Sequence, residues 1–161
     1  DQTIVQSFDW PTIDAIKKKW PETTIIGLLG AGQVIPAKDG SFPWLGLDLD
    51  GDFNGDWVAA AKSIGCSGVT PSHGSPGTRT PNSPDYVPFV TKEIVDRAHN
   101  SGMTVIPYTV DHAVTVAKLI EMGVDGVITN YPEMAMAIAK KYGLKTGHKE
   151  SRPRPQCLAH A

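Results

Sequence analysis

Apolar positions along the chain form two alternating kinds of run. Short, continuous aliphatic or β-branched runs are typical of buried strands, and stretches with apolar residues three or four positions apart are typical of amphipathic helices. Strands are expected at 3–8, 23–29, 67–70, 103–110 and 125–129. Helices are expected at 10–20, 56–64, 92–100, 112–122 and 132–142. This alternation predicts an α/β fold in which parallel strands are joined by helical crossovers.

Two long connections interrupt the alternation. Residues 30–53 and 71–88 are rich in Gly, Pro and polar side chains and are expected to be loops. Asp9 and Asp111 stand immediately before expected helices, where a carboxylate can cap the first turn. Residues 145–161 are polar and lack an apolar period, so we expect a disordered tail after a globular part that spans residues 1–144.

Composition narrows the classes of function. The 161 residues carry 15 basic and 17 acidic side chains, a net charge of −2, which provides no basic surface for nucleic acid. No apolar run approaches the roughly 18 residues that a membrane-spanning helix needs. The two cysteines, Cys66 and Cys157, do not make a disulfide framework.

Polar and aromatic residues collect where the expected strands end, which is where parallel α/β folds gather their functional groups. Ser7 and Phe8 end the first strand, His73 follows the third, and Tyr108 lies late in the fourth. His73 is either a pocket residue or an ordinary loop residue, and Tyr108 either lines a pocket or fills the core. A hydrolase with a metal held by His73 and His112 is a further hypothesis, although no carboxylate cluster supports a metal beside them.

The acidic stretch 48–56 contains a candidate calcium site. Asp50, Asp52 and Asn54 fit the opening of an Asp-x-Asp-x-Asn-Gly loop, in which oxygens of alternating residues surround the ion. The twelfth position of such a loop would be Ala61 rather than a bidentate Glu. The stretch is therefore either a calcium site or a solvated loop that leads into the next helix.

Three segments, at residues 5–9, 102–111 and 123–132, resemble the glycerophosphodiester phosphodiesterase family in its order and spacing. They read Val-Gln-Ser-Phe-Asp, Gly-Met-Thr-Val-Ile-Pro-Tyr-Thr-Val-Asp and Gly-Val-Asp-Gly-Val-Ile-Thr-Asn-Tyr-Pro. The resemblance covers about residues 3–144 and implies a partial (β/α)8 TIM barrel, about the last five parallel strands with their helices. Tyr108 stands where the family usually has Trp, and Asn130 where it usually has Asp.

The resemblance implies a phosphoric diester hydrolase that converts a glycerophosphodiester and water to an alcohol and glycerol phosphate. The family uses a divalent metal, calcium or magnesium, and two histidines as general acid and base, and opens with a His-Arg-Gly motif that this sequence lacks. By resemblance, Ser7 and Phe8 face the barrel mouth and Tyr108 lines the substrate pocket. His73 is a further pocket candidate from its position at a strand end.

Because the histidine pair and metal ligands are missing, the chain is expected to be inactive alone. Five strands cannot close an eight-stranded barrel, so a missing N-terminal segment or self-association is expected to complete it. The inward-facing aliphatic residues of 25–29 and 105–107 would otherwise meet water. The alternative is a non-catalytic half-barrel module that binds a partner or a small ligand, with calcium at Asp50, Asp52 and Asn54. The resemblance leaves the alcohol head group open.

Overall fold

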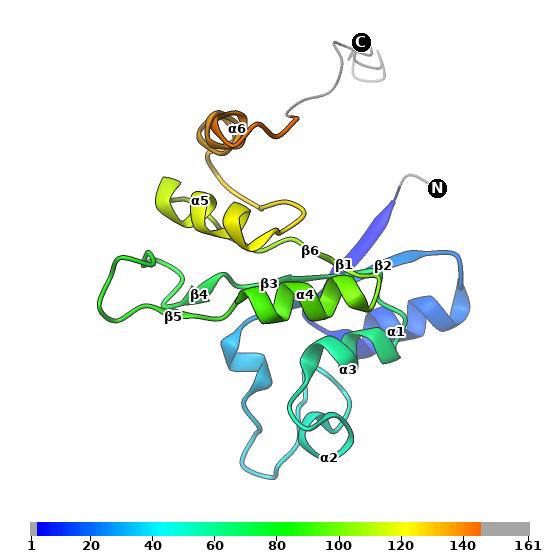
Figure 1. Cartoon of the computed structure of the whole chain (residues 1–161). Helices are drawn as coiled ribbons and strands as arrows, with labels where there is room; N and C mark the ends of the chain where they lie inside the picture. The colour runs from blue at the N-terminus through cyan, green and yellow to red at the C-terminus, as the bar shows by residue number, and fades with distance from the viewer. Residues whose placement is uncertain (1–2, 146–161) are drawn as a thin grey trace, which may run out of the picture.

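The structure, a computed structural model, describes residues 3–145 and is built around one parallel sheet (Figure 1). Within these residues the sheet has four strands in the order β1-β2-β3-β6. They are β1 (Ile4–Ser7), β2 (Thr24–Leu29), β3 (Gly68–Pro71) and β6 (Thr104–Val105). A small antiparallel pair, β4 (Gly74–Ser75) with β5 (Val87–Pro88), forms in the loop after β3. The tail predicted at 145–161 lies, apart from residue 145, outside the described residues.

Helices follow the strands as predicted, with one addition. They are α1 (Trp10–Lys19), α2 (Leu49–Phe53), α3 (Trp57–Ser63), α4 (Lys92–Asn100), α5 (Ala113–Met122) and α6 (Pro132–Lys141), with a 3-10 turn η1 (Ala31–Val34). The prediction of a loop throughout 30–53 was wrong, because Asp48 caps α2 by accepting a hydrogen bond from Gly51 N at 2.8 Å. In residues 3–145, no helix combines the length and the apolar character that crossing a bilayer would take.

The last two predicted strands are shorter or irregular. Residues 103–110 form a strand only at β6, and 125–129 forms none, although its backbone lies against β6 and the residues after it. Asp125 N donates to Val105 O at 3.0 Å, and Ile128 N donates to Pro107 O at 2.8 Å. A regular ladder fails here because Pro107 has no N–H and the N–H of Val105 donates to the Asp125 side chain.

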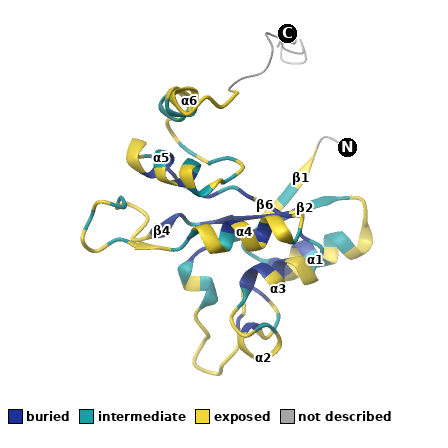
Figure 2. Ribbon diagram, in the orientation of Figure 1, coloured by how far each residue is buried: buried dark blue, intermediate teal, exposed yellow. Residues whose placement is uncertain are grey.

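The register gives the sheet two different faces, since paired residues in a parallel ladder point to the same side. On the first face, Ile25, Val69 and Val105 are completely buried. Figure 1 shows α1, α3 and α4 grouped on one side of the sheet, and Figure 2 shows the buried residues concentrated between them. The inward-facing aliphatic residues that were expected to meet water lie on the opposite face, where Leu28 and Ile106 are half-buried and Ile26 is 7% exposed.

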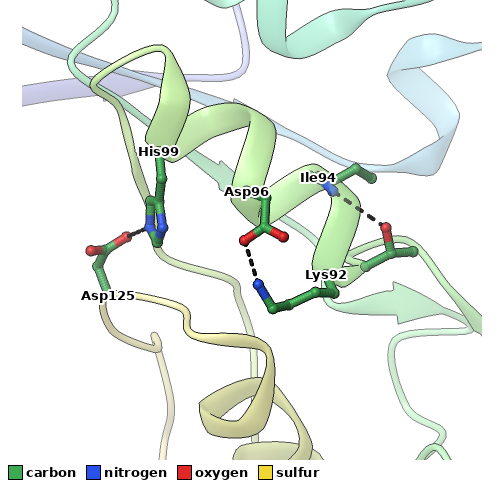
Figure 3. Close-up of polar contacts among 6 residues, drawn as sticks. Lys92, Ile94, Asp96, His99 and Asp125 are labelled. Carbon is green, nitrogen blue, oxygen red and sulfur yellow. Dashed lines mark hydrogen bonds and ion pairs between the residues drawn. The ribbon is translucent and has the colours of Figure 1, made fainter.

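A carboxylate ties the end of α4 to the region after α5. Asp125 Oδ2 accepts a hydrogen bond from Val105 N at 2.8 Å and lies 2.9 Å from His99 Nε2 (Figure 3). The other acid of this view, Asp96, pairs with Lys92 on the exposed surface of α4. The Asp125 side chain thus accepts the hydrogen bond from Val105 N–H that a backbone carbonyl of the 125–129 segment would accept in a regular ladder.

Replacing Asp125 by Ala is expected to lower the free energy of unfolding by about 1–3 kcal/mol, because Val105 N loses its acceptor. Asp96→Ala is the matched control and is expected to cost less than about 0.5 kcal/mol, since it removes one exposed ion pair. Urea unfolding followed by circular dichroism measures both values. Equal losses in the two variants would contradict the role given to Asp125.

Candidate functional site

Two aromatic rings meet across the carboxyl end of the sheet. Phe8 and Tyr108 are half-buried, their ring centroids are 5.7 Å apart, and the rings stand edge to face at 83°. An isolated parallel bridge between Ser72 and Tyr108 extends the β3–β6 ladder to this point. The Tyr108 hydroxyl donates to Leu29 O at 3.2 Å, and burial raises the pKa of its phenol. The structure therefore brings together two residues predicted to lie in the pocket.

Polar groups surround Gly30, beside this pair. The Gly30 N–H donates to Gln33 Oε1 at 2.7 Å. A Cβ atom added to Gly30 would lie 3.1 Å from Gln33 Oε1, 3.2 Å from Tyr108 Oη and 3.6 Å from Ser72 Oγ. The sequence reasoning missed Gly30, Gln33 and Ser72 as candidates. A glycine directly after a strand, followed three residues later by a side-chain amide, was the available signal.

Ser7 does not join this group. Its pairing with Gly27 places it on the helix-packed face of the sheet, and Ser7 Oγ accepts a hydrogen bond from Asp9 N at 3.0 Å. The predicted capping by the Asp9 side chain is also absent, since that carboxylate accepts from Thr12 Oγ1 at 2.6 Å and α1 has no side-chain cap. Ser7 shapes the turn from strand to helix, and its place at a barrel mouth stays a prediction.

His73 is buried, with 1% of its surface exposed. Its Nε2 lies 3.0 Å from Gly77 O and its Nδ1 3.1 Å from Tyr86 Oη. Since a carbonyl only accepts, Nε2 carries the proton of the neutral ring. Burial lowers the pKa of His73 below its usual range, opposed by the hydrogen bond to Gly77. This geometry favours a structural histidine that holds the loop 74–88, and a substrate contact by His73 stays a prediction.

An open polar hollow lies at the ends of β6 and the 125–129 segment. Its volume is about 630 Å³, which is within the range of small-ligand sites. Its lining residues are Gly77, Thr78, Thr109, Asp111, His112, Asn130 and Tyr131. Asp111 does not cap α5 as predicted, because His112 occupies the N-cap position. Asp111 instead accepts hydrogen bonds from Asn130 N at 2.8 Å and Asn130 Nδ2 at 2.7 Å, and these bonds lower the pKa of its carboxyl.

The candidate metal ligands do not converge. Asp50 and Asp52 are exposed on α2, where residues two apart point about 200° away from each other, and Asn54 follows as the exposed C-cap. Among residues 3–145, no three or more His, Cys, Asp or Glu side chains are grouped so that they could hold a metal ion. The hypothesis of a metal between His73 and His112 gains no support, since both ring nitrogens of His73 have protein partners. The described residues therefore do not fit a divalent metal site.

A parallel sheet with helices on one face and polar and aromatic groups at its carboxyl end defines the class of β/α barrel-like folds. The sequence model described as the Glycerophosphoryl diester phosphodiesterase family matches residues 1–134. The chain therefore belongs to the glycerophosphoryl diester phosphodiesterase family.

Individual relatives agree with this assignment. The chain is 36% identical over 59 residues to the glycerophosphodiester phosphodiesterase of Bacillus subtilis. The matched segment covers 37% of this chain and 20% of that one. It is 37% identical over 78 residues to the uncharacterized Bacillus subtilis protein YqiK, covering 48% of this chain and 27% of that one. The chain thus matches only about a fifth to a quarter of the length of these curated relatives.

Solved structures show the same fold. A Silicibacter pomeroyi protein, provisionally named a glycerophosphoryl diester phosphodiesterase, matches with a TM-score of 0.66 and 24% identity over 89% of this chain and 39% of its own. The Oleispira antarctica phosphodiesterase, solved with its product sn-glycerol-3-phosphate, matches with a TM-score of 0.57 and 18% identity over 85% of this chain and 41% of its own. At these identities the likeness concerns the fold alone.

Replacing His73 by Gln is expected to reduce the loss of stability at acid pH. The pKa of His73 is lower in the folded chain than the ordinary value of about 6.5 in the unfolded chain, so the unfolded state binds more protons. The contribution of His73 to the free energy of unfolding should therefore be constant above about pH 6.5. It should fall as the pH drops toward the pKa of His73 in the folded chain.

Urea midpoints at pH 7.5 and pH 5.5 measure this effect in the wild-type chain, His73→Gln and His112→Gln. The difference between the two urea midpoints should be smaller in His73→Gln than in the wild-type chain. It should be unchanged in His112→Gln, whose imidazole is exposed. If the difference between the two urea midpoints were as large in His73→Gln as in the wild-type chain, another group would cause the pH dependence.

Proposed function

We propose that residues 3–145 provide substrate-binding wall and scaffold for a glycerophosphodiester phosphodiesterase, which hydrolyses a glycerophosphodiester to an alcohol and glycerol phosphate. Membership of the family supports the class of reaction. The observation that carries the binding role is the contact between Phe8 and Tyr108 at the carboxyl end of the sheet. The name of the relative from Bacillus subtilis that is called a glycerophosphodiester phosphodiesterase supports the same substrate class. The product bound to the Oleispira antarctica enzyme supports it as well.

Hydrolysis of a phosphodiester needs stabilisation of charge on the phosphate and proton transfer at the attacking and leaving oxygens. Around the Phe8 and Tyr108 pair, the strand ends of this chain offer aromatic faces and uncharged hydrogen-bonding groups, while the Asp111 carboxylate lies in the hollow after β6. The Phe8 and Tyr108 rings would pack against the carbon skeleton of the bound glycerol or alcohol group, and the fixed Tyr108 hydroxyl would orient it. We assign binding and orientation to this chain, and phosphate activation and proton transfer to groups outside residues 3–145.

The proposal includes an arc of five strands that further β/α units complete. The hydrogen bonds from the 125–129 segment to Val105 and Pro107 support a fifth strand position. At the other edge, β1 pairs with β2 alone among the described residues, and Ile4 and Trp20 are 58% and 49% exposed beside a groove. An unpaired strand edge next to apolar side chains suits an added unit, from another segment or a second copy.

The isolated 161-residue chain is expected to release no choline from glycerophosphocholine above background, with calcium or magnesium present. Co-expression with the part of the Bacillus subtilis relative that precedes the shared segment is expected to give metal-dependent release. In that complex Tyr108→Ala should lower kcat/KM by about tenfold or more, because an orienting contact is lost.

Tyr142→Ala is the matched control, since Tyr142 is an exposed tyrosine whose hydroxyl donates to Glu121 Oε1. Metal-dependent hydrolysis by the isolated chain would contradict the assignment of proton transfer to other groups. Unchanged kcat/KM in Tyr108→Ala would contradict the proposed wall.

A further inference from the structure

We propose that a pocket between the loop 74–88 and α5 binds an aliphatic carboxylate of about six carbon atoms, whose carboxylate group contacts Thr115 and Lys118. The proposal is independent of the proposed function. This pocket shares no lining residue with the hollow beside Asp111, and neither Phe8 nor Tyr108 lines it. It is therefore a second binding site, outside the surface assigned to the diester substrate.

The first step is the size and the apolar lining of the pocket. Its volume is about 150 Å³. An apolar cavity of about that size holds a molecule of about six carbon atoms, such as benzene. On α5, Leu119 and Met122 line it, and they lie on the same helix face as Thr115 because the three residues are four and three positions apart. The pocket therefore offers an apolar surface to a short hydrocarbon chain.

The second step is the wall that the loop provides. Pro81, Tyr86 and Pro88 line the pocket from this side. The Tyr86 hydroxyl donates to His73 O at 3.0 Å, and the Tyr86 ring stacks on the His73 ring with centroids 5.8 Å apart. The ring also lies directly against Gly74, where an added Cβ atom would collide with it. Because these contacts hold the wall in place, a ligand does not have to order it on binding.

The third step is a buried hydroxyl without a hydrogen bond. Thr115 lines the pocket and is 1% exposed, and among the described residues its Oγ1 has no hydrogen-bond partner. A helical threonine can donate to the carbonyl four residues earlier, which here would be that of Asp111, and this bond does not form. A threonine in a helix has two favoured χ1 rotamers, so the hydroxyl can turn toward an acceptor. A ligand oxygen in the pocket would recover the free energy that the unpaired hydroxyl costs.

The fourth step is charge. Lys118 lies one turn after Thr115 and is the one charged residue among those that line the pocket. Glu121 Oε2 is 3.6 Å from Lys118 Nζ, but both side chains are about half exposed, so this pair is weak. A carboxylate would accept a hydrogen bond from Thr115 and pair with Lys118, whereas an ammonium group would meet a like charge. The lining therefore favours an anionic oxygen head group on an apolar chain.

The test titrates the full chain, with ¹³C-labelled methyl groups, with hexanoate, acetate and hexylamine at neutral pH. The methyl signals of Thr115, Leu119 and Met122 should shift with hexanoate and reach saturation. Acetate should bind about tenfold more weakly or less, because each buried methylene group contributes about fourfold to the affinity. Hexylamine, which has the same chain length and the opposite charge, should bind about fivefold more weakly or less.

Thr115→Val should weaken hexanoate binding by about fivefold or more, because it removes the donor and keeps the shape of the side chain. Its urea midpoint should be equal to or higher than that of the wild-type chain, since an unpaired buried hydroxyl is lost. Lys118→Gln should weaken hexanoate binding by about threefold or more and should not weaken hexylamine binding. Lys62→Gln is the matched control, since Lys62 is exposed on α3 and does not line the pocket.

Three results would overturn the proposal. Hexanoate that does not saturate, or that shifts only methyl groups outside the pocket, would show that the pocket is not a binding site. Hexylamine that binds as tightly as hexanoate would exclude selection for a carboxylate. Unchanged hexanoate affinity in Thr115→Val and Lys118→Gln, with urea midpoints that show folded chains, would exclude the head-group contacts. None of these results bears on Phe8 and Tyr108, so the proposed function is tested separately.

Discussion

The packing of helices against one face of the parallel sheet is the constraint on which the rest of the structure depends. Trp10 of α1 lies on Gly27 of β2, where a Cβ atom would come within 3.0 Å of the indole, and its Nε1 donates to Leu28 O at 2.9 Å. A slip of one residue would turn the buried Ile25 away from this core and end the contact. The same register sends the alternate residues to the other face, where Phe8 and Tyr108 meet at the carboxyl end.

Much of the fold could be predicted where local signals and packing agree. The helix at 92–100 was predicted with its observed bounds, because Thr91 accepts a hydrogen bond from Ile94 N and Gly102 follows with positive φ. The failures have local causes that compete with the apolar pattern. Pro107 interrupts the predicted strand at 103–110. The five-residue α2 depends on a capping contact by Asp48, which is hard to recognise in a sequence stretch whose acidic residues resemble a loop.

The site was less predictable, because its contacts join residues that are far apart in sequence. Position at a strand end was enough to suggest Phe8 and Tyr108 as pocket residues. The same criterion also suggested Ser7, although the register places Ser7 on the helix-packed face. The polar contacts around Gly30 depend on distances between three connections, which no sequence spacing encodes. Calcium at Asp50, Asp52 and Asn54 stays a prediction, although the spacing of these residues fits a loop and the chain forms a helix there.

A crystal structure of this chain with glycerol 3-phosphate bound is the most direct test of the central claim that the carboxyl end of the second sheet face is a binding surface. The account predicts ligand density against the Phe8 and Tyr108 rings. Ligand held only in the hollow between Asp111 and Tyr131, or along the groove beside β1, would contradict it.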